Sequence, residues 1–126
     1  MLLFLYFEFR VEILEKGDGI TYASEEDRVT YHYTSFMENG TQFASSHDYK
    51  IPSETDIGCP LTIQGLNIGL TKVSLNEKAR IYIPWNMAYG DKHVGVLVPQ
   101  SNIYIDVEIK KIEFGSENDA NQYSEL

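Results

Sequence analysis

Cysteine is almost absent from this sequence, because Cys59 is the only one among 126 residues. A single cysteine forms no internal disulfide, so the fold must depend on a hydrophobic core, and a reducing, cytoplasmic compartment is favoured. The three histidines, His32, His47 and His93, lie far apart in the chain, and no second cysteine joins them. The spacing of these residues therefore predicts no metal site.

Positive charge is also scarce. Ten lysines and arginines stand against 19 aspartates and glutamates, which gives a formal net charge of −9. Surfaces that bind nucleic acid or anionic membranes need clustered lysine and arginine to neutralise phosphates, and the chain contains no basic run. The composition therefore argues against nucleic-acid and membrane partners.

No apolar run approaches the roughly 20 residues that cross a bilayer. Residues 1–9 are apolar, but they are few and lack a basic leading segment, so they fit a signal peptide badly. From Leu3 to Ile13 apolar residues alternate with polar ones, which is the period of a half-buried strand. We interpret residues 1–8 as an extension of the first strand. A truncated targeting segment is the alternative, and it would open a secretory route.

What the sequence does contain suits one globular domain. Hydrophobic residues make up 43% and charged residues 23%, and the length allows one core but not two ordinary domains. Nine tyrosines and six phenylalanines indicate strands, together with either an aromatic core or an aromatic-lined cavity. We expect the domain to span residues 1–114, and we expect the polar, acidic residues 115–126 to be a disordered tail.

Alternating patterns predict further strands at residues 29–36, 79–84 and 102–114, with Asn39-Gly40 turning the chain toward a short strand at 41–43. In the last strand the alternation shifts at residues 111–112, which predicts a bulge or the end of the strand. Residues 44–60 read as a long irregular connection with an edge segment inside it.

One helix is predicted, at residues 62–73, because Ile63, Leu66, Leu70 and Val73 share a face. Gly65 and Gly69 lie one turn apart within it. Each costs about 1 kcal/mol relative to alanine in a helix, so their presence indicates a close approach to the sheet. Antiparallel strands with a single helix define an α+β class.

Four segments, in this order, resemble the FKBP family of immunophilins: VEILEKGDG at 11–19; VTYHYT at 29–34 with NG at 39–40 and FASS at 43–46; LTIQGL at 61–66 with GL at 69–70; and AYG at 88–90, HVGVLVP at 93–99 and IDVE at 105–108. The likeness covers nearly all of residues 9–114. It implies an FKBP-like twisted antiparallel sheet of five or six strands around one short helix. It also implies peptidyl-prolyl cis–trans isomerisation without metal or cofactor. Nothing in the sequence suggests more than a monomer. Its partners would be proline-containing peptides or proteins and macrolides of the tacrolimus and rapamycin type.

The resemblance also implies which residues form the site. The pocket walls would be Tyr33, Phe43, Val96, Leu97 and Ile105, and Leu66 would be its floor. The hydroxyl of Tyr89 and the backbone N–H of Ile63 would each donate a hydrogen bond to a substrate carbonyl. Ala44, Thr62 and His93 would lie beside the pocket, and Trp85 outside it. Without the family, Tyr33 and Phe43 would be ordinary core aromatics.

The chain departs from the family pattern at four positions. Ala44 replaces a usual aspartate, Leu66 a tryptophan, Ile105 a phenylalanine and Val98 a proline. Loss of the carboxylate removes a polar anchor, and leucine in place of an indole makes fewer contacts with a proline ring. Two hypotheses follow: an isomerase of reduced activity, or a non-catalytic binding module that kept the fold after its pocket changed.

Overall fold

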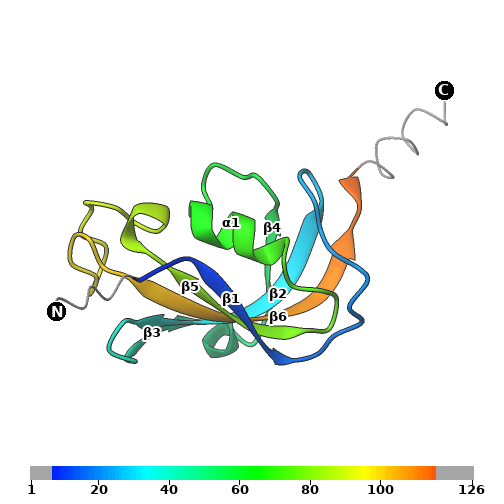
Figure 1. The fold of residues 1–126 in the computed structure, drawn as a ribbon, viewed down its shortest axis with the longest axis horizontal. Helices are drawn as coiled ribbons and strands as arrows, with labels where there is room; N and C mark the ends of the chain where they lie inside the picture. The colour runs from blue at the N-terminus through cyan, green and yellow to red at the C-terminus, as the bar shows by residue number, and fades with distance from the viewer. Residues whose placement is uncertain (1–6, 116–126) are drawn as a thin grey trace, which may run out of the picture.

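The computed structural model describes residues 7–115, which form a six-stranded antiparallel sheet with one α-helix lying across one face (Figure 1). This confirms the predicted α+β class and strand number. The elements are, in chain order, β1 (Arg10–Glu15), β2 (Arg28–Met37), β3 (Gln42–Ser45), the 3-10 turn η1 (Ser46–Tyr49), β4 (Ser53–Asp56), α1 (Gln64–Leu70), β5 (Lys78–Ile83), the 3-10 turn η2 (Trp85–Met87) and β6 (Ile103–Glu113).

The strand order is β1-β5-β6-β2-β3, and β4 also pairs with β2. Strands β3 and β4 therefore divide one edge of β2 between them, with η1 in the connection. The predicted Asn39-Gly40 turn is confirmed. Gly40 has φ +93°, and the amide of Thr41 donates to the side chain of Asn39, so β3 folds back on β2.

A bulge interrupts the long pairing of β2 with β6. Thr30 pairs with Lys111, while the next residue, Tyr31, pairs with Ile109, so Lys110 is the extra residue. The predicted break lay one residue further on, at residues 111–112. The strand continues past the bulge to Glu113, because β2 still offers a backbone partner there.

Two predicted elements are shorter than the sequence indicated. Strand β1 begins at Arg10, which pairs with Tyr82, and β5 ends one residue further on at Ile83, ahead of Pro84, so residues 7 and 8 have no residue of β5 to pair with. Of the proposed strand extension at residues 1–8, residues 7 and 8 lie in no strand and residues 1–6 lie outside the described residues, as do residues 116–126 of the predicted tail at 115–126. Helix α1 covers Gln64–Leu70 rather than 62–73.

The helix ends early because its hydrogen bonding tightens. The amides of Thr71 and Lys72 donate to carbonyls three residues back, on Ile68 and Gly69, and the Thr71 hydroxyl also donates to the Ile68 carbonyl at 2.6 Å. The helix begins at Gln64, with Ile63 as its N-cap residue and no side chain capping its first turn. The predicted start at Pro60 or Thr62 was therefore wrong. No helix within residues 7–115 is long and apolar enough to cross a membrane.

The core lies between α1 and the sheet. Leu70, Val73, Ile81, Ile83, Ile103 and Ile109 are fully buried there. The two helix glycines allow the close approach that their positions predicted. A Cβ at Gly65 would lie 2.3 Å from Ile83 Cγ2, and a Cβ at Gly69 would lie 2.7 Å from Ile81 Cδ1. The helix is thereby held low over β5, which leaves a hollow beside it above β2 and β6.

Candidate active site

The hollow beside α1 is a cavity of about 310 Å³. The elements that form it are β2, β3, β4, the segment leading into α1, the helix itself, the loop after η2, and β6. Its lining residues are Tyr31, Tyr33, Ser35, Phe43, Ala44, Ser53, Glu54, Thr55, Leu61, Thr62, Ile63, Leu66, Tyr89 and Ile105. Aromatic rings and aliphatic side chains therefore share this cavity with many hydroxyl groups.

Most of the residues that the sequence nominated come together around this cavity: Tyr33, Phe43, Ala44, Thr62, Ile63, Leu66, Tyr89 and Ile105. Three others do not line it. Backbone hydrogen bonds between Val94 and Leu97 in both directions close a small loop, which turns Leu97 into the core with 1% exposure. The same loop leaves Val96 64% exposed, and His93 is also exposed.

Two tyrosines that line the cavity, Tyr31 and Tyr89, stay protonated. Burial raises the pKa of Tyr89, and the nearby phenol of Tyr33 raises it further. Burial, followed by the influence of Tyr33 and Tyr89, raises the pKa of Tyr31 to about 12. Tyr31 and Tyr89 are therefore neutral hydrogen-bond donors throughout the physiological pH range.

A backbone donor lies at the start of α1. Ile63 is the N-cap residue, and its carbonyl accepts hydrogen bonds from the amides of Leu66 and Asn67. Its own N–H donates to no group within residues 7–115. The neighbouring Thr62 hydroxyl is engaged with the Thr55 hydroxyl at 2.9 Å, which ties the helix entry to β4. The Ile63 N–H is thus available to a ligand carbonyl, as first-turn amides of helices commonly are.

Sequence reasoning missed the lining residues Tyr31, Ser35, Ser53, Glu54, Thr55 and Leu61. Tyr31 and Ser35 share the alternation of Tyr33 on β2, so the period of that strand already assigned them to the same face. The segment 53–55 carried no such signal, because β4 is only four residues long and follows an irregular turn.

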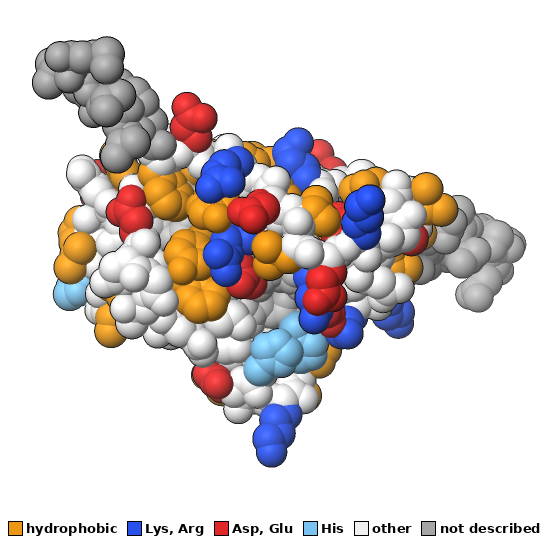
Figure 2. Space-filling model, turned by 60° about the horizontal axis from the view of Figure 1, so that its bottom comes forward, with side chains coloured by type: hydrophobic (Ala, Val, Ile, Leu, Met, Phe, Trp, Pro, Cys, Tyr) orange, Lys and Arg blue, Asp and Glu red, His pale blue; other side chains and the backbone are white. Residues whose placement is uncertain are grey.

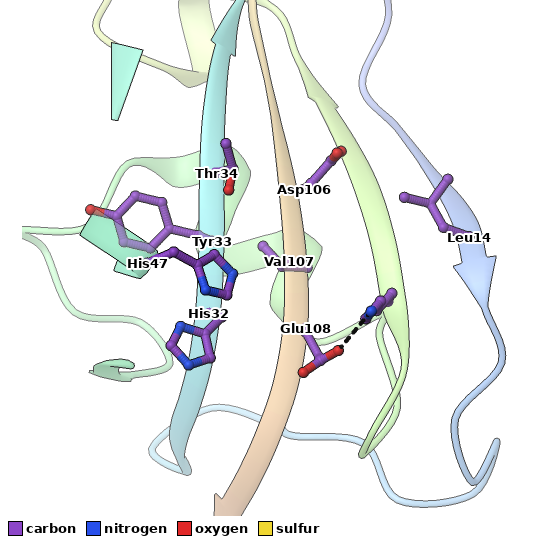
Figure 3. A pocket seen from close by; sticks show the side chains of 9 residues that line it. Leu14, His32, Tyr33, Thr34, His47, Asp106, Val107 and Glu108 are labelled. Carbon is purple, nitrogen blue, oxygen red and sulfur yellow. Dashed lines mark ion pairs between the residues drawn. The ribbon is translucent and has the colours of Figure 1, made fainter. Parts of the chain in front are cut away.

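A second cavity, of about 280 Å³, lies on the face of the sheet turned away from α1. Figure 3 shows His32 on β2 and His47 beside the acidic side chains Asp106 and Glu108 of β6. The two imidazole rings stack with centroids 4.3 Å apart, and His32 Nδ1 lies 2.9 Å from Ser46 Oγ. Figure 2 shows histidine side chains side by side on this face, next to acidic and basic groups.

The stacking of His32 and His47 could not be expected from their separation along the chain. Glu108, directly across from His32 on β6, forms ion pairs with Lys78 at 3.4 Å and with Lys110. Over residues 7–115, nowhere do three or more histidine, cysteine or acidic side chains gather as metal ligands would.

The histidine stack should make stability depend on pH. Burial lowers the pKa of His32 below its ordinary 6.5, and the neighbouring His47 and Lys110 lower it further against the opposing effect of Glu108. The unfolded chain therefore binds this proton more readily. The resulting contribution to stability is complete above about pH 6.5 and is lost as the pH falls through that value toward the lower folded pKa.

Urea unfolding between pH 5 and 8 checks this expectation. His32→Gln, which keeps a hydrogen-bonding side chain beside Ser46, should flatten the decline in the free energy of unfolding below pH 6.5. His93→Gln, at an exposed histidine outside the stack, should leave the decline unchanged. An identical pH dependence in the His32 variant and the parent chain would contradict the prediction.

The fold and the cavity together define a small α+β domain with an aromatic pocket between helix and sheet. Residues 19–110 match the family model described as FKBP-type peptidyl-prolyl cis-trans isomerase. FK506-binding protein 1 of Saccharomyces cerevisiae is 39% identical over 104 residues, which are 82% of this chain and 91% of that protein. The peptidyl-prolyl cis-trans isomerase Fkbp12 of Drosophila melanogaster is 38% identical over 98 residues, or 77% of this chain and 91% of that protein.

Among solved structures, FkpA from Escherichia coli matches with a TM-score of 0.75 and 25% identity over 83% of this chain. The match covers 48% of FkpA, so this chain spans about half its length. The chain belongs to the FKBP-type peptidyl-prolyl cis–trans isomerase family. The predicted fold and isomerase activity are confirmed, and nothing in the comparisons favours the non-catalytic binding module.

Proposed function

We propose that the cavity between α1 and the sheet is the isomerase site, and that the proline ring of an X-Pro peptide inserts into it. One observation carries the proposal: Tyr33, Phe43, Leu66 and Ile105 line the same cavity as Tyr89 and the helix entry. Such a site offers an apolar enclosure for the ring and polar donors for the adjoining backbone, as small-ligand sites usually do.

The chemistry needs no nucleophile. Rotation about the peptide bond crosses a barrier of about 18–20 kcal/mol that resonance creates. In the twisted bond resonance is lost and the carbonyl is less polar, so an apolar pocket disfavours the planar amide more than the twisted one. A barrier lower by about 4 kcal/mol accelerates the rotation about a thousandfold.

Each residue then has a role. Tyr33, Phe43, Leu66 and Ile105 enclose the proline ring, and the Tyr89 hydroxyl and the Ile63 N–H hold carbonyl oxygens on either side of the bond. Ala44 and Thr62 complete the rim.

The residues outside the cavity serve the flanking peptide. His93 and Val96, in the exposed loop, contact the peptide chain on either side of the proline. Leu97 supports that loop from the core.

We infer that the turnover is lower than in family members that have an indole at the floor. Leu66 contacts less of a proline ring, and Ala44 offers no carboxylate anchor. The same two substitutions should weaken binding of macrolides, a ligand class suggested by the relatives named FK506-binding protein. Substrates are exposed X-Pro bonds in proteins. A monomer in the cytoplasm fits the net charge of −9, which keeps copies apart, and the single cysteine.

Exchange NMR on a Leu-Pro-Phe peptide tests this assignment. Catalytic amounts of the folded chain should accelerate cis–trans exchange, and a macrolide of the rapamycin type should suppress the acceleration. Acceleration that persists when the macrolide fills the cavity would show that the catalytic site lies elsewhere. No acceleration by a folded sample would favour the binding module.

Tyr89→Phe should lower kcat/KM on this peptide about fivefold, because one hydrogen bond of about 1 kcal/mol is lost while the ring stays. The same exchange NMR experiment measures kcat/KM for the variant and for the parent chain. Tyr49→Phe is the matched control, since Tyr49 is 75% exposed and lies outside the cavity, and its kcat/KM should equal that of the parent chain. Equal kcat/KM values for the two variants would show that the Tyr89 hydroxyl takes no part in catalysis.

A further inference from the structure

The floor of the cavity carries hydroxyl groups. The most deeply buried of its lining residues are Tyr31 and Ser35, each 5% exposed, Ile105 at 4% and Leu66 at 9%. Tyr31 and Ser35 both point from β2 toward the helix side, on either side of Tyr33. Half of this floor is therefore hydrocarbon, and the other half can form hydrogen bonds.

Neither floor hydroxyl has a hydrogen-bond partner in the part of the chain that the structure describes. Within residues 7–115, Tyr31 Oη and Ser35 Oγ form no hydrogen bond with any other group. Yet no fully enclosed side-chain nitrogen or oxygen in this part of the chain lacks a partner. Both oxygens must therefore be reached by solvent, and the cavity that both residues line is the space that reaches them.

A ligand that fills the cavity must replace the hydrogen bonds that water forms with an unpartnered hydroxyl. A purely hydrocarbon ring that fills the cavity displaces the water from the hydroxyl and leaves it unsatisfied, which disfavours binding. A ring that carries its own hydroxyl restores the lost hydrogen bond. The phenol of Tyr31 suits this role, because its raised pKa of about 12 keeps it neutral, able both to donate and to accept.

The position of the ring decides which atom meets the floor. If Tyr89 and Ile63 hold the peptide carbonyls at the rim, the proline ring enters with its backbone atoms outermost. Carbon 4 of the ring, opposite the backbone, then reaches deepest. A hydroxyl on that carbon is the substituent best placed to meet Tyr31, whose ring lies beside Tyr33 with centroids 6.0 Å apart.

We propose that Tyr31 is a further ligand-binding residue of this cavity, and that its hydroxyl hydrogen-bonds the 4-hydroxyl of an inserted hydroxyproline. The substrates of the site then include X-hydroxyproline bonds as well as X-Pro bonds. This inference rests on the proposed placement of the isomerase site. It adds a substrate class and a residue to which the family resemblance assigned no role.

The test compares two proteins on three peptides. Exchange NMR gives kcat/KM for the parent chain and for Tyr31→Phe, on Leu-Pro-Phe and on its 4-hydroxyproline counterparts in both configurations at carbon 4. Each value is divided by the uncatalysed rate of its own peptide. For one configuration, Tyr31→Phe should lower the ratio of the hydroxyproline rate to the proline rate about fivefold, whatever its rate on Leu-Pro-Phe alone.

Two controls accompany the cycle. Tyr49→Phe, at a distant exposed tyrosine, should keep the parent ratio. The parent chain alone should also turn over the favoured 4-hydroxyproline peptide about fivefold faster than a 4-methylproline peptide of the same configuration. That comparison matches the size of the substituent and requires no variant to fold.

The outcomes separate the two proposals. A ratio unchanged by Tyr31→Phe, or equal turnover of the hydroxyl and methyl peptides, overturns the role of Tyr31 while the isomerase site stands. Failure of the parent chain to accelerate even Leu-Pro-Phe, in a folded sample, overturns the proposed function itself and the inference with it.

Discussion

Phe43→Ala is expected to lower kcat/KM on Leu-Pro-Phe about thirtyfold. Phe43 lies on β3, half-buried, and lines the cavity together with Tyr33 and Ile105. Removing its ring opens one wall of the pocket to water. About 2 kcal/mol of apolar contact with the proline ring is lost in the transition state, and this amounts to about thirtyfold in rate.

A matched aromatic on the other face of the sheet separates catalysis from stability. Phe36, on β2, stacks on Tyr104 with centroids 4.8 Å apart and does not line the cavity. Phe36→Ala should lower the free energy of unfolding but keep kcat/KM within twofold, measured at a temperature where both variants are folded. A rate for Phe43→Ala as high as that for Phe36→Ala would mean that β3 is not a wall of the working site.

Gly65→Ala is expected to lower the free energy of unfolding by about 2 kcal/mol. Helix propensity alone predicts the opposite sign, a gain of about 1 kcal/mol. The new Cβ would lie 2.3 Å from Ile83 Cγ2 and 3.0 Å from Ile83 Cγ1. Ile83 is fully buried on β5, so its side chain has no free space to enter, and overpacking of this kind costs about 1–3 kcal/mol.

Urea unfolding of the single and double variants tests the steric origin. Ile83→Ala removes the atoms that the new Cβ would meet, so Gly65→Ala added to Ile83→Ala should cost less than it does alone. Gln64→Ala, at the exposed first position of α1, changes propensity without a clash and should leave stability nearly unchanged. A Gly65→Ala variant as stable as the parent would show that α1 moves away from β5 at little cost.

The strands were predictable because alternation is a local property of the backbone. Ile103, Ile105, Val107 and Ile109 are buried on one face of β6, as their spacing required. The residues around the cavity were predictable for another reason, since short motifs such as Ala88-Tyr89-Gly90 carry the family likeness. Nothing in periodicity alone distinguishes Phe43 from an ordinary core aromatic.

Other features depended on contacts between distant segments. The C-terminal end of α1 follows from hydrogen bonds of Thr71 and Lys72 that the apolar pattern of 62–73 does not reveal. The stack of His32 on His47 exists because η1 folds back over β2, where Ser46 Oγ accepts from the amide of Tyr33 at 2.9 Å.

By itself, the sequence determined the α+β class, the faces of the strands, the close approach at Gly65 and the family of the chain, because each is encoded in neighbouring residues. Only the tertiary structure decided that Leu97 belongs to the core and that the hydroxyls of Tyr31 and Ser35 reach the cavity without a hydrogen-bond partner among residues 7–115. The physical reason is that burial and hydrogen-bond satisfaction depend on what other segments bring to a side chain. Here α1, β3 and β4 enclose one face of β2 and leave its hydroxyls for a ligand.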